Sequence, residues 1–220
     1  MLQYLREFPV TLGLAIAALL VFLIPQAESA MDFQTGGPLF GQWFQLFSCH
    51  LAHWSADHLI WDLVMFVTMG AICEKQNRKV YLGVLVASAI LIPVGVSFMA
   101  TGIDSYRGLS GIDTALFGMA MWHLVGNAKA DRNWWAFGIF SLLFVGMFAK
   151  IGYEYLSGGT LFAAADNFTA VPSAHLVGAV IGCAAGLFEI SGRSKIRGSW
   201  KRSNARITHK TRKLKGEVCR

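Results

Sequence analysis

The sequence predicts an all-α membrane protein that crosses the bilayer several times. Of its 220 residues, 55% are hydrophobic and only 15% are charged, whereas soluble domains carry about 25% charged residues. Apolar stretches of roughly 20 residues recur along the chain, and each is long enough to cross about 30 Å of hydrocarbon. This composition argues against a cytosolic enzyme and against a nucleic-acid-binding protein, and the length argues against several domains.

Six apolar segments are predicted to span the membrane, and the short loops between them indicate a compact bundle. The first segment lacks a small-residue cleavage site at the right place, so we expect a retained anchor and not a signal peptide. The six spans define a membrane domain, residues 1–191, which is followed by a basic tail, residues 192–220. The predicted spans are residues 9–25, 54–73, 79–101, 110–126, 134–151 and 170–190.

The distribution of Lys and Arg predicts that both termini are cytoplasmic. The last 28 residues hold 11 of the 19 Lys and Arg residues, and none lies between Arg6 and Lys75. With the N-terminus inside, 17 of these cations fall on the cytoplasmic side and only Arg107 and Lys150 fall outside, as the positive-inside rule requires. The tail is expected to be disordered and attracted to anionic lipids of the cytoplasmic leaflet.

Residues 31–53 form an aromatic segment that we do not expect to span the membrane. The segment is rich in Gly and Gln and has no charged residue after Asp32. Aromatic side chains of this kind suit the membrane interface, so a loop lying on the outer leaflet is predicted. Of the four cysteines only Cys49 falls on this side, so the sequence does not indicate a disulfide framework.

Ionisable residues inside the spans are costly to place in lipid, and each is therefore a candidate functional residue. At a rise of about 1.5 Å per residue, His58, Asp62 and His175 fall in the outer third of the membrane. Ser110, the first residue of the fourth span, falls at a similar depth. Three different spans thus contribute polar groups to one layer, which indicates a site.

Two further ionisable residues lie in the fourth span. His123 is expected near the cytoplasmic surface, roughly 20 Å along the helix from Ser110, in an interfacial role. Asp113 shares part of the helix face of Ser110. It either tunes the site or forms a hydrogen bond to a neighbouring helix, and the sequence leaves both hypotheses open.

The residue types in this layer suit acyl transfer. Ser110 supplies a nucleophile, and His175 supplies a general base on another span. The backbone N–H of Ser110, at a helix N-terminus, and the His58 side chain are candidate donors to an oxyanion. Gly108 and Gly111 flank the serine, allow a tight turn and let a peptide approach closely.

Small residues indicate that the fourth and sixth spans pack closely. Gly178 and Gly182 lie on one face of the sixth span, just below His175, and small residues also line one face of the fourth span. Faces of this kind let helix backbones approach each other. Their contact would bring His175 near Ser110.

Three motifs occur in order along these spans. The letters GLSG at residues 108–111 are similar to the GxSG motif of the rhomboid family, and AHLVG at residues 174–178 resembles the segment of its catalytic histidine. The pattern formed by His53, His58 and Asp62 resembles the second-span HxxxxHxxxN, with Asp in place of Asn. The aromatic segment resembles the rhomboid first loop, and the run YRGLSG with the short six-span layout is similar to the rhombosortase branch.

The resemblance implies a six-helix rhomboid-like bundle that acts as an intramembrane serine endopeptidase with a Ser110–His175 dyad and no cofactor. It also implies that His58 lies in the oxyanion region and that His53 is a structural polar residue of the second span. The expected substrates are membrane-anchored proteins whose transmembrane segments unwind easily. They would be cut near the outer face of a bacterial inner membrane.

Asp62 leaves two hypotheses open. If it is protonated, it donates a hydrogen bond as the family Asn does; if it is ionised, it pairs with His58 one helical turn away. The sequence favours the protonated donor, because a neutral group avoids placing negative charge beside a developing oxyanion.

Two other functions compete with the protease. One is an inactive rhomboid-like protein that binds membrane clients, against which the presence of both Ser110 and His175 argues. The other is a haem- or ion-carrying bundle that uses His58 and His175, which leaves Ser110 unexplained. A Soret band would support haem, whereas labelling of Ser110 by a serine-reactive probe would support the hydrolase.

Overall fold

The computed structural model describes residues 7–24, 26–100, 102–159 and 171–189. Contacts divide the chain into two units, residues 1–186 and residues 187–220. The basic tail predicted at residues 192–220 lies outside the described residues.

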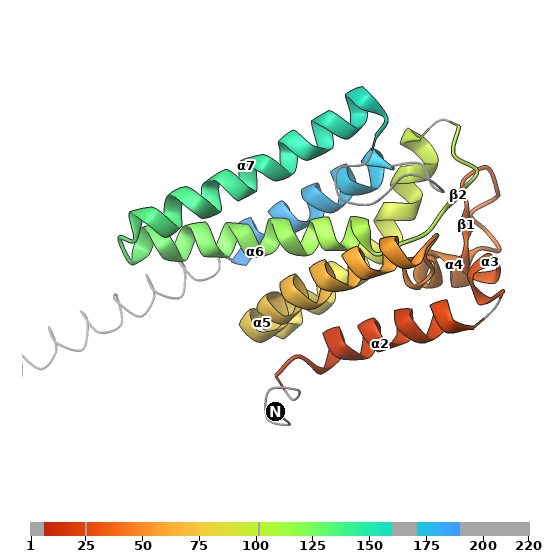
Figure 1. Cartoon of the computed structure of the whole chain (residues 1–220), viewed down its shortest axis with the longest axis horizontal. Coiled ribbons are helices and arrows are strands. Elements are labelled where there is room, and N and C mark those ends of the chain that lie inside the picture. The colour runs from red at the N-terminus through yellow and green to blue at the C-terminus, as the bar shows by residue number, and fades with distance from the viewer. Residues whose placement is uncertain (1–6, 25, 101, 160–170, 190–220) are drawn as a thin grey trace, which may run out of the picture. The chain divides into compact units, whose positions relative to one another are not determined.

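Long helices make up most of the first unit, and they agree with the predicted all-α class. Helices α7, α6, α5 and α2 lie side by side in that order (Figure 1). The short elements gather at one end of this row. The elements are α2 (Pro9–Leu23), α3 (Ala27–Met31), β1 (Phe33–Gln34), α4 (Trp43–Ser48), the 3₁₀ helix η1 (Cys49–Leu51), α5 (Ala56–Met99), β2 (Ser105–Tyr106), α6 (Ser110–Ala130), α7 (Trp134–Ser157) and the helix Pro172–Glu189.

Helix α5 contains the second and third predicted spans. Its first half is capped by Ser55, whose hydroxyl oxygen accepts a hydrogen bond from the His58 N–H at 3.2 Å. Asn77 then leaves the helical region with φ −157° and ψ 89°. Its side-chain oxygen accepts from the N–H of Val80 at 3.3 Å and so caps the second half. The break divides α5 between the two predicted spans.

Helices α6 and α7 extend beyond their predicted ends. The fourth span was expected to stop at residue 126 and the fifth at residue 151, but the helices run to Ala130 and Ser157. At the predicted end of the fifth span, Lys150 and Glu154 form an ion pair at 2.6 Å one turn apart, which lets the helix accommodate both charges. Of the described helices, α5, α7 and Pro172–Glu189 are long and apolar enough to cross a membrane.

Glu74, in the first half of α5, and its hydrogen-bond partners connect α2 to both halves of α5. This carboxylate is 2% exposed and accepts hydrogen bonds from the Thr11 N–H and hydroxyl, each at 2.9 Å. The Thr11 hydroxyl also bonds to the Tyr81 hydroxyl at 2.9 Å, and Arg78 pairs with Glu74 at 3.0 Å. A carboxylate at a helix N-terminus satisfies N–H groups that have no intrahelical acceptor.

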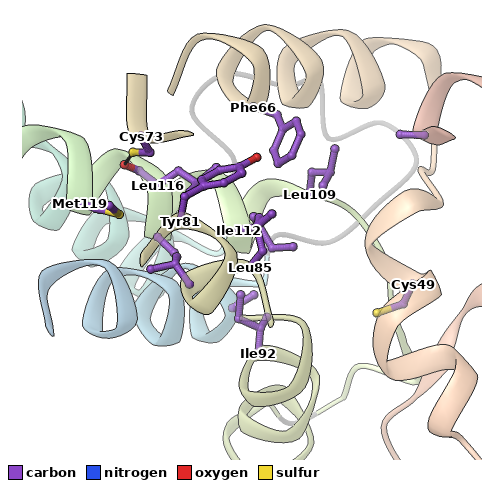
Figure 2. Packing of buried hydrophobic residues seen from close by; sticks show 14 of the residues in the cluster. Cys49, Phe66, Cys73, Tyr81, Leu85, Ile92, Leu109, Ile112, Leu116 and Met119 are labelled. Atoms are coloured by element: carbon purple, nitrogen blue, oxygen red, sulfur yellow. Dashed lines mark hydrogen bonds between the residues drawn. The ribbon is translucent and has the colours of Figure 1, made fainter. Parts of the chain in front are cut away.

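The core lies between the two halves of α5 and the first half of α6. Its buried side chains form one cluster (Figure 2). The Cys73 thiol donates to the Leu116 carbonyl at 3.4 Å, which ties α5 to α6 within this cluster. On α7, by contrast, large apolar side chains such as Trp135, Leu142 and Leu156 are exposed, as expected for a face that contacts lipid.

Candidate active site

The small sheet joins the aromatic segment to the residues that precede Ser110. Strands β1 and β2 are antiparallel, with Phe33 opposite Tyr106 and Gln34 opposite Ser105 (Figure 1). Phe33 is fully buried, whereas the later aromatic side chains of the segment are exposed, with Phe40 at 84%, which agrees with an interfacial loop. The ladder therefore fixes the start of the loop that leads into α6.

Gly108 occupies a turn that no other residue would fit. Its φ is +121°, and a Cβ atom there would lie 2.8 Å from Cε1 of His58, so both backbone and space require glycine. The Gly108 N–H donates to the Cys49 carbonyl at 3.0 Å. The Gly108 carbonyl lies 3.4 Å from the Tyr106 hydroxyl, which donates to it, and 3.3 Å from Nδ1 of His50.

Asp62 anchors the next peptide of the turn. Its Oδ2 atom accepts a hydrogen bond from the Leu109 N–H at 2.9 Å. The same oxygen lies 3.2 Å from Nε2 of His53 and 3.3 Å from Nε2 of His58. Asp62 therefore contacts His58, as the paired hypothesis expects, and also contacts His53. The sequence did not reveal that Leu109, 47 residues away, supplies a donor.

Ser110 is the first residue of α6, as predicted, and its side chain is half-buried. Its carbonyl accepts a hydrogen bond from the Thr114 hydroxyl at 2.8 Å. The N–H of a first helical residue has no acceptor within its own helix. Ser110 is therefore a half-buried residue whose backbone N–H is a donor at the start of the helix.

Helix α6 and the helix Pro172–Glu189 are in backbone contact. A Cβ atom at Gly178 would collide with the Gly111 carbonyl oxygen, and one at Gly182 would collide with that of Ala115. Both contacts advance by four residues along the two helices in the same direction, so the helices run parallel and begin at the same end. The small faces of the two helices therefore pack closely, and His175 lies at the end of the contact where Ser110 lies.

His175 is 8% exposed and has an acidic partner that the sequence analysis missed. Its Nδ1 atom lies 2.6 Å from Oε2 of Glu154 on α7. Lys150 Nζ lies 2.6 Å from Oε1 of Glu154 and 3.5 Å from Nδ1 of His175. Glu154 was missed because the fifth span was expected to end at residue 151. The spacing of Lys150 and Glu154 by four residues was the available signal. His175 is also close enough to His58 for their charges to interact.

Arg107 connects the loop before Ser110 to the aromatic segment, a role that the sequence did not indicate. Its guanidinium pairs with Glu28 at 3.2 Å and with Asp32 at 3.0 Å. It also stacks over the Trp54 ring, 3.5 Å from the centroid. Burial raises the pKa of Asp32, and the Arg107 charge counteracts this shift.

The two ionisable residues of α6 are both buried. His123 is 2% exposed, so it packs inside the bundle, and α6 continues beyond it to Ala130. Asp113 is 5% exposed and lies one turn below Ser110.

The structure therefore brings most of the predicted site residues to one end of the bundle. The residues from α5 and from the loop before α6 are in direct contact, and the helix of His175 packs against the start of α6. A family model for the Rhomboid domain matches residues 40–192. The chain belongs to the rhomboid family. The match includes all the predicted site residues, which are His53, His58, Asp62, Gly108, Ser110, Gly111, His175, Gly178 and Gly182.

As a member of the rhomboid family, this chain is an integral membrane protein with an all-α fold. Rhomboids include intramembrane serine proteases that act on membrane proteins, and the apolar helices agree with that location. A comparison with curated proteins returned no match.

Proposed function

We propose that this rhomboid is an active intramembrane serine endopeptidase in which Ser110 is the nucleophile and His175 is the general base. The observation that carries the proposal is the backbone contact between the helices of the two residues at Gly178 and Gly182. This contact sets the start of both helices at one end. A generic helix pair would not also bring a buried histidine to the level of a half-buried serine.

The reaction follows from these roles. His175 accepts the hydroxyl proton of Ser110 while the serine oxygen attacks the scissile carbonyl carbon. The tetrahedral intermediate then expels the amine, which receives that proton from His175, and an acyl-enzyme remains. Water attacks the ester, its proton passes to His175 and then to Ser110 Oγ, and the carboxylic acid product leaves.

The oxyanion needs donors that are already in position. The backbone N–H of Ser110 is one donor, because it lies at the helix N-terminus. The His58 ring, which lies against Gly108 two residues before the nucleophile, is the second. The first donor follows the turn that Asp62, Cys49 and Tyr106 hold in place, and the second packs against that turn from α5.

The proposed substrates are membrane-anchored proteins cut near the outer face of a bacterial inner membrane. Segments that unwind easily are favoured, because a helical peptide bond must leave its helix before Ser110 can reach it. The similarity of YRGLSG to the rhombosortase branch points to substrates with a C-terminal glycine-rich sorting helix. Proteomics of released ectodomains, with and without active protein, tests this substrate class.

The dyad is tested by substitution in purified protein. Ser110→Ala and His175→Ala should each abolish cleavage, and the double variant should be no worse than either single variant, because the two groups act as one unit. Ser141→Ala on α7 is the matched control and should cleave at the parental rate. A serine-reactive fluorophosphonate should label the parental protein but not Ser110→Ala. Parental cleavage by Ser110→Ala would exclude the proposed mechanism.

A further inference from the structure

A buried carboxylate that the dyad does not use lies directly behind His175. Glu154 is 2% exposed, and its Oε2 atom is 2.6 Å from Nδ1 of His175. The residue comes from α7, a helix that contributes no other group to the proposed mechanism. A carboxylate this deeply buried is costly unless it is paired and hydrogen-bonded, so its position needs an explanation.

The register of two helices sets this contact. Only three described residues of α7 are buried, namely Met147, Ile151 and Glu154, and their spacing makes one stripe along the helix. Met147 and Ile151 pack in one cluster with Ala179, which lies one turn after His175. Glu154 continues the stripe by one turn and therefore meets His175.

The charges around Glu154 define the state of the histidine ring. Oε1 of Glu154 pairs with Lys150 at 2.6 Å, which leaves Oε2 for His175. A carboxylate that accepts from a lysine ammonium is stabilised in its ionised form, and an ionised carboxylate can only accept. Nδ1 of His175 must therefore donate, and in the neutral ring Nε2 is then unprotonated and able to take a proton.

We propose that Glu154 is a positioning residue that makes the site a Ser110–His175–Glu154 arrangement and not a dyad alone. The proposal rests on the proposed function. Glu154 fixes the ring orientation and the Nδ1–H tautomer of His175, and its charge stabilises the imidazolium that forms when Ser110 attacks. Glu154 takes up no proton: the proton moves between Ser110 Oγ, Nε2 of His175 and the leaving amine.

Substitution of Glu154 should reduce turnover more than substrate binding. In other serine hydrolases the loss of the acidic member lowers kcat by about 10⁴, and a fall of about 10² to 10⁴ is expected for Glu154→Gln with KM nearly unchanged. Glu154→Asp keeps the charge and should recover part of the rate.

The charged and titratable groups that face His175 are Glu154 and Lys150 from α7 and His58 from α5. Removal of the only carboxylate among them should move the acidic limb of the kcat/KM profile to lower pH.

Glu74 provides a matched control. It is also 2% exposed and also pairs with a cation one turn away, Arg78, but it lies in the α2–α5 contact. Glu74→Gln should lower the melting temperature and leave kcat and the pH profile of the folded protein unchanged.

The tautomer of His175 is tested by nitrogen NMR of the parental protein, with the His175 signals assigned through His175→Gln. Nδ1 should be protonated and Nε2 should be unprotonated.

The outcomes of these experiments separate the role of Glu154 from the proposed protease function. Parental kcat in Glu154→Gln, with Ser110→Ala inactive, would overturn the role of Glu154 and leave the protease intact. A fall in kcat that matches the loss of folded protein, with an unshifted pH profile, would make Glu154 a structural residue and also overturn the proposal. So would a neutral His175 ring protonated at Nε2. Parental cleavage by Ser110→Ala would instead remove the proposed function itself.

Discussion

At the scale of single residues, Asp62 links the second span to the turn before Ser110. Its Oδ2 atom accepts from the Leu109 N–H at 2.9 Å, and two histidine nitrogens lie within 3.3 Å of it. Both oxygens of an ionised carboxylate accept hydrogen bonds, whereas an amide offers one acceptor oxygen and adds an NH2 group that could face the Leu109 N–H. We therefore expect asparagine to be a poor replacement for aspartate at this position.

Asp62→Asn should lower kcat/KM across the whole pH range. Hydrogen bonds to charged groups contribute about 1.5–3 kcal/mol, which corresponds to a loss of about tenfold to a hundredfold if the turn before Ser110 loosens. A pH–rate profile of both proteins measures this. Full activity in Asp62→Asn, extended to higher pH, would instead support a protonated Asp62 that donates as the family asparagine does.

His50 is a second residue whose environment has a measurable consequence. It is 2% exposed in η1, outside the predicted spans, with its ring nitrogens near the carbonyls of Gly108 and Ala89. Burial lowers the pKa of His50 to about 4, from an ordinary value of 6.5. The unfolded chain therefore binds a proton first as the pH falls, so the stability that His50 contributes is complete above pH 6.5 and is lost between pH 6.5 and about 4.

The melting temperature of the parental protein should thus fall as the pH is lowered from 7.5 to 4.5. His50→Asn removes this titration, so its melting temperature should be lower at pH 7.5 but should change less with pH. Thermal unfolding of both proteins in one detergent, followed by circular dichroism, provides the comparison. Equal pH dependence in the two proteins would show that His50 does not contribute to it.

At the scale of elements, the contact between α6 and the helix Pro172–Glu189 determines whether the site forms. The contact depends on glycines that leave no space between the backbones, since Cβ atoms at Gly178 and Gly182 would overlap carbonyl oxygens of α6. A carbonyl oxygen cannot rotate away as a side chain does, so the helices would have to separate. Separation would move His175 away from Ser110.

Gly182→Ala should therefore reduce both stability and activity. Overpacking typically costs about 1–3 kcal/mol, and cleavage should fall by more than the loss of folded protein, because the dyad geometry is disturbed. Gly152→Ala on α7 is the control: a Cβ atom at Gly152 meets nothing within 4 Å, and alanine is the better helix former. Thermal unfolding and cleavage rate are measured together, and equal effects of the two substitutions would contradict the close-packing argument.

At the scale of the whole molecule, the orientation in the membrane decides which side of the bilayer is the side of cleavage. Helix α6 and the helix of His175 run parallel and begin at the same end, so Ser110 and His175 lie on the same side whatever the orientation. The distribution of Lys and Arg predicts that this end lies outside. Membrane-anchored substrates would then be released to the outer side.

A reporter fused after Arg220 should be cytoplasmic, and one inserted within residues 152–169 should be outside. Alkaline phosphatase and green fluorescent protein, which are active on opposite sides of a bacterial membrane, give complementary signals at both positions. An external C-terminus would place Ser110 and His175 at the cytoplasmic face and would overturn the predicted side of cleavage.

Local patterns were sufficient for much of this protein. Apolar runs of the right length predicted its membrane class and the order of its helices, because a backbone in lipid must satisfy its hydrogen bonds within each helix. The flanking glycines and the position of Ser110 were equally visible, since a turn before a helix and a row of small residues are features of a few consecutive residues. Local patterns misjudged the ends of α6 and α7, where the charged residues beyond the apolar core remain helical.

The tertiary structure decided which polar groups meet. Glu154 lies 21 residues from His175, and Asp62 lies 47 residues from Leu109, distances along the chain that no spacing rule connects. These pairs depend on helix register, on the break at Asn77 and on the close approach that the glycines permit. A buried carboxylate takes its role from the donors that surround it, and those donors are set by packing between helices and not by neighbours in the sequence.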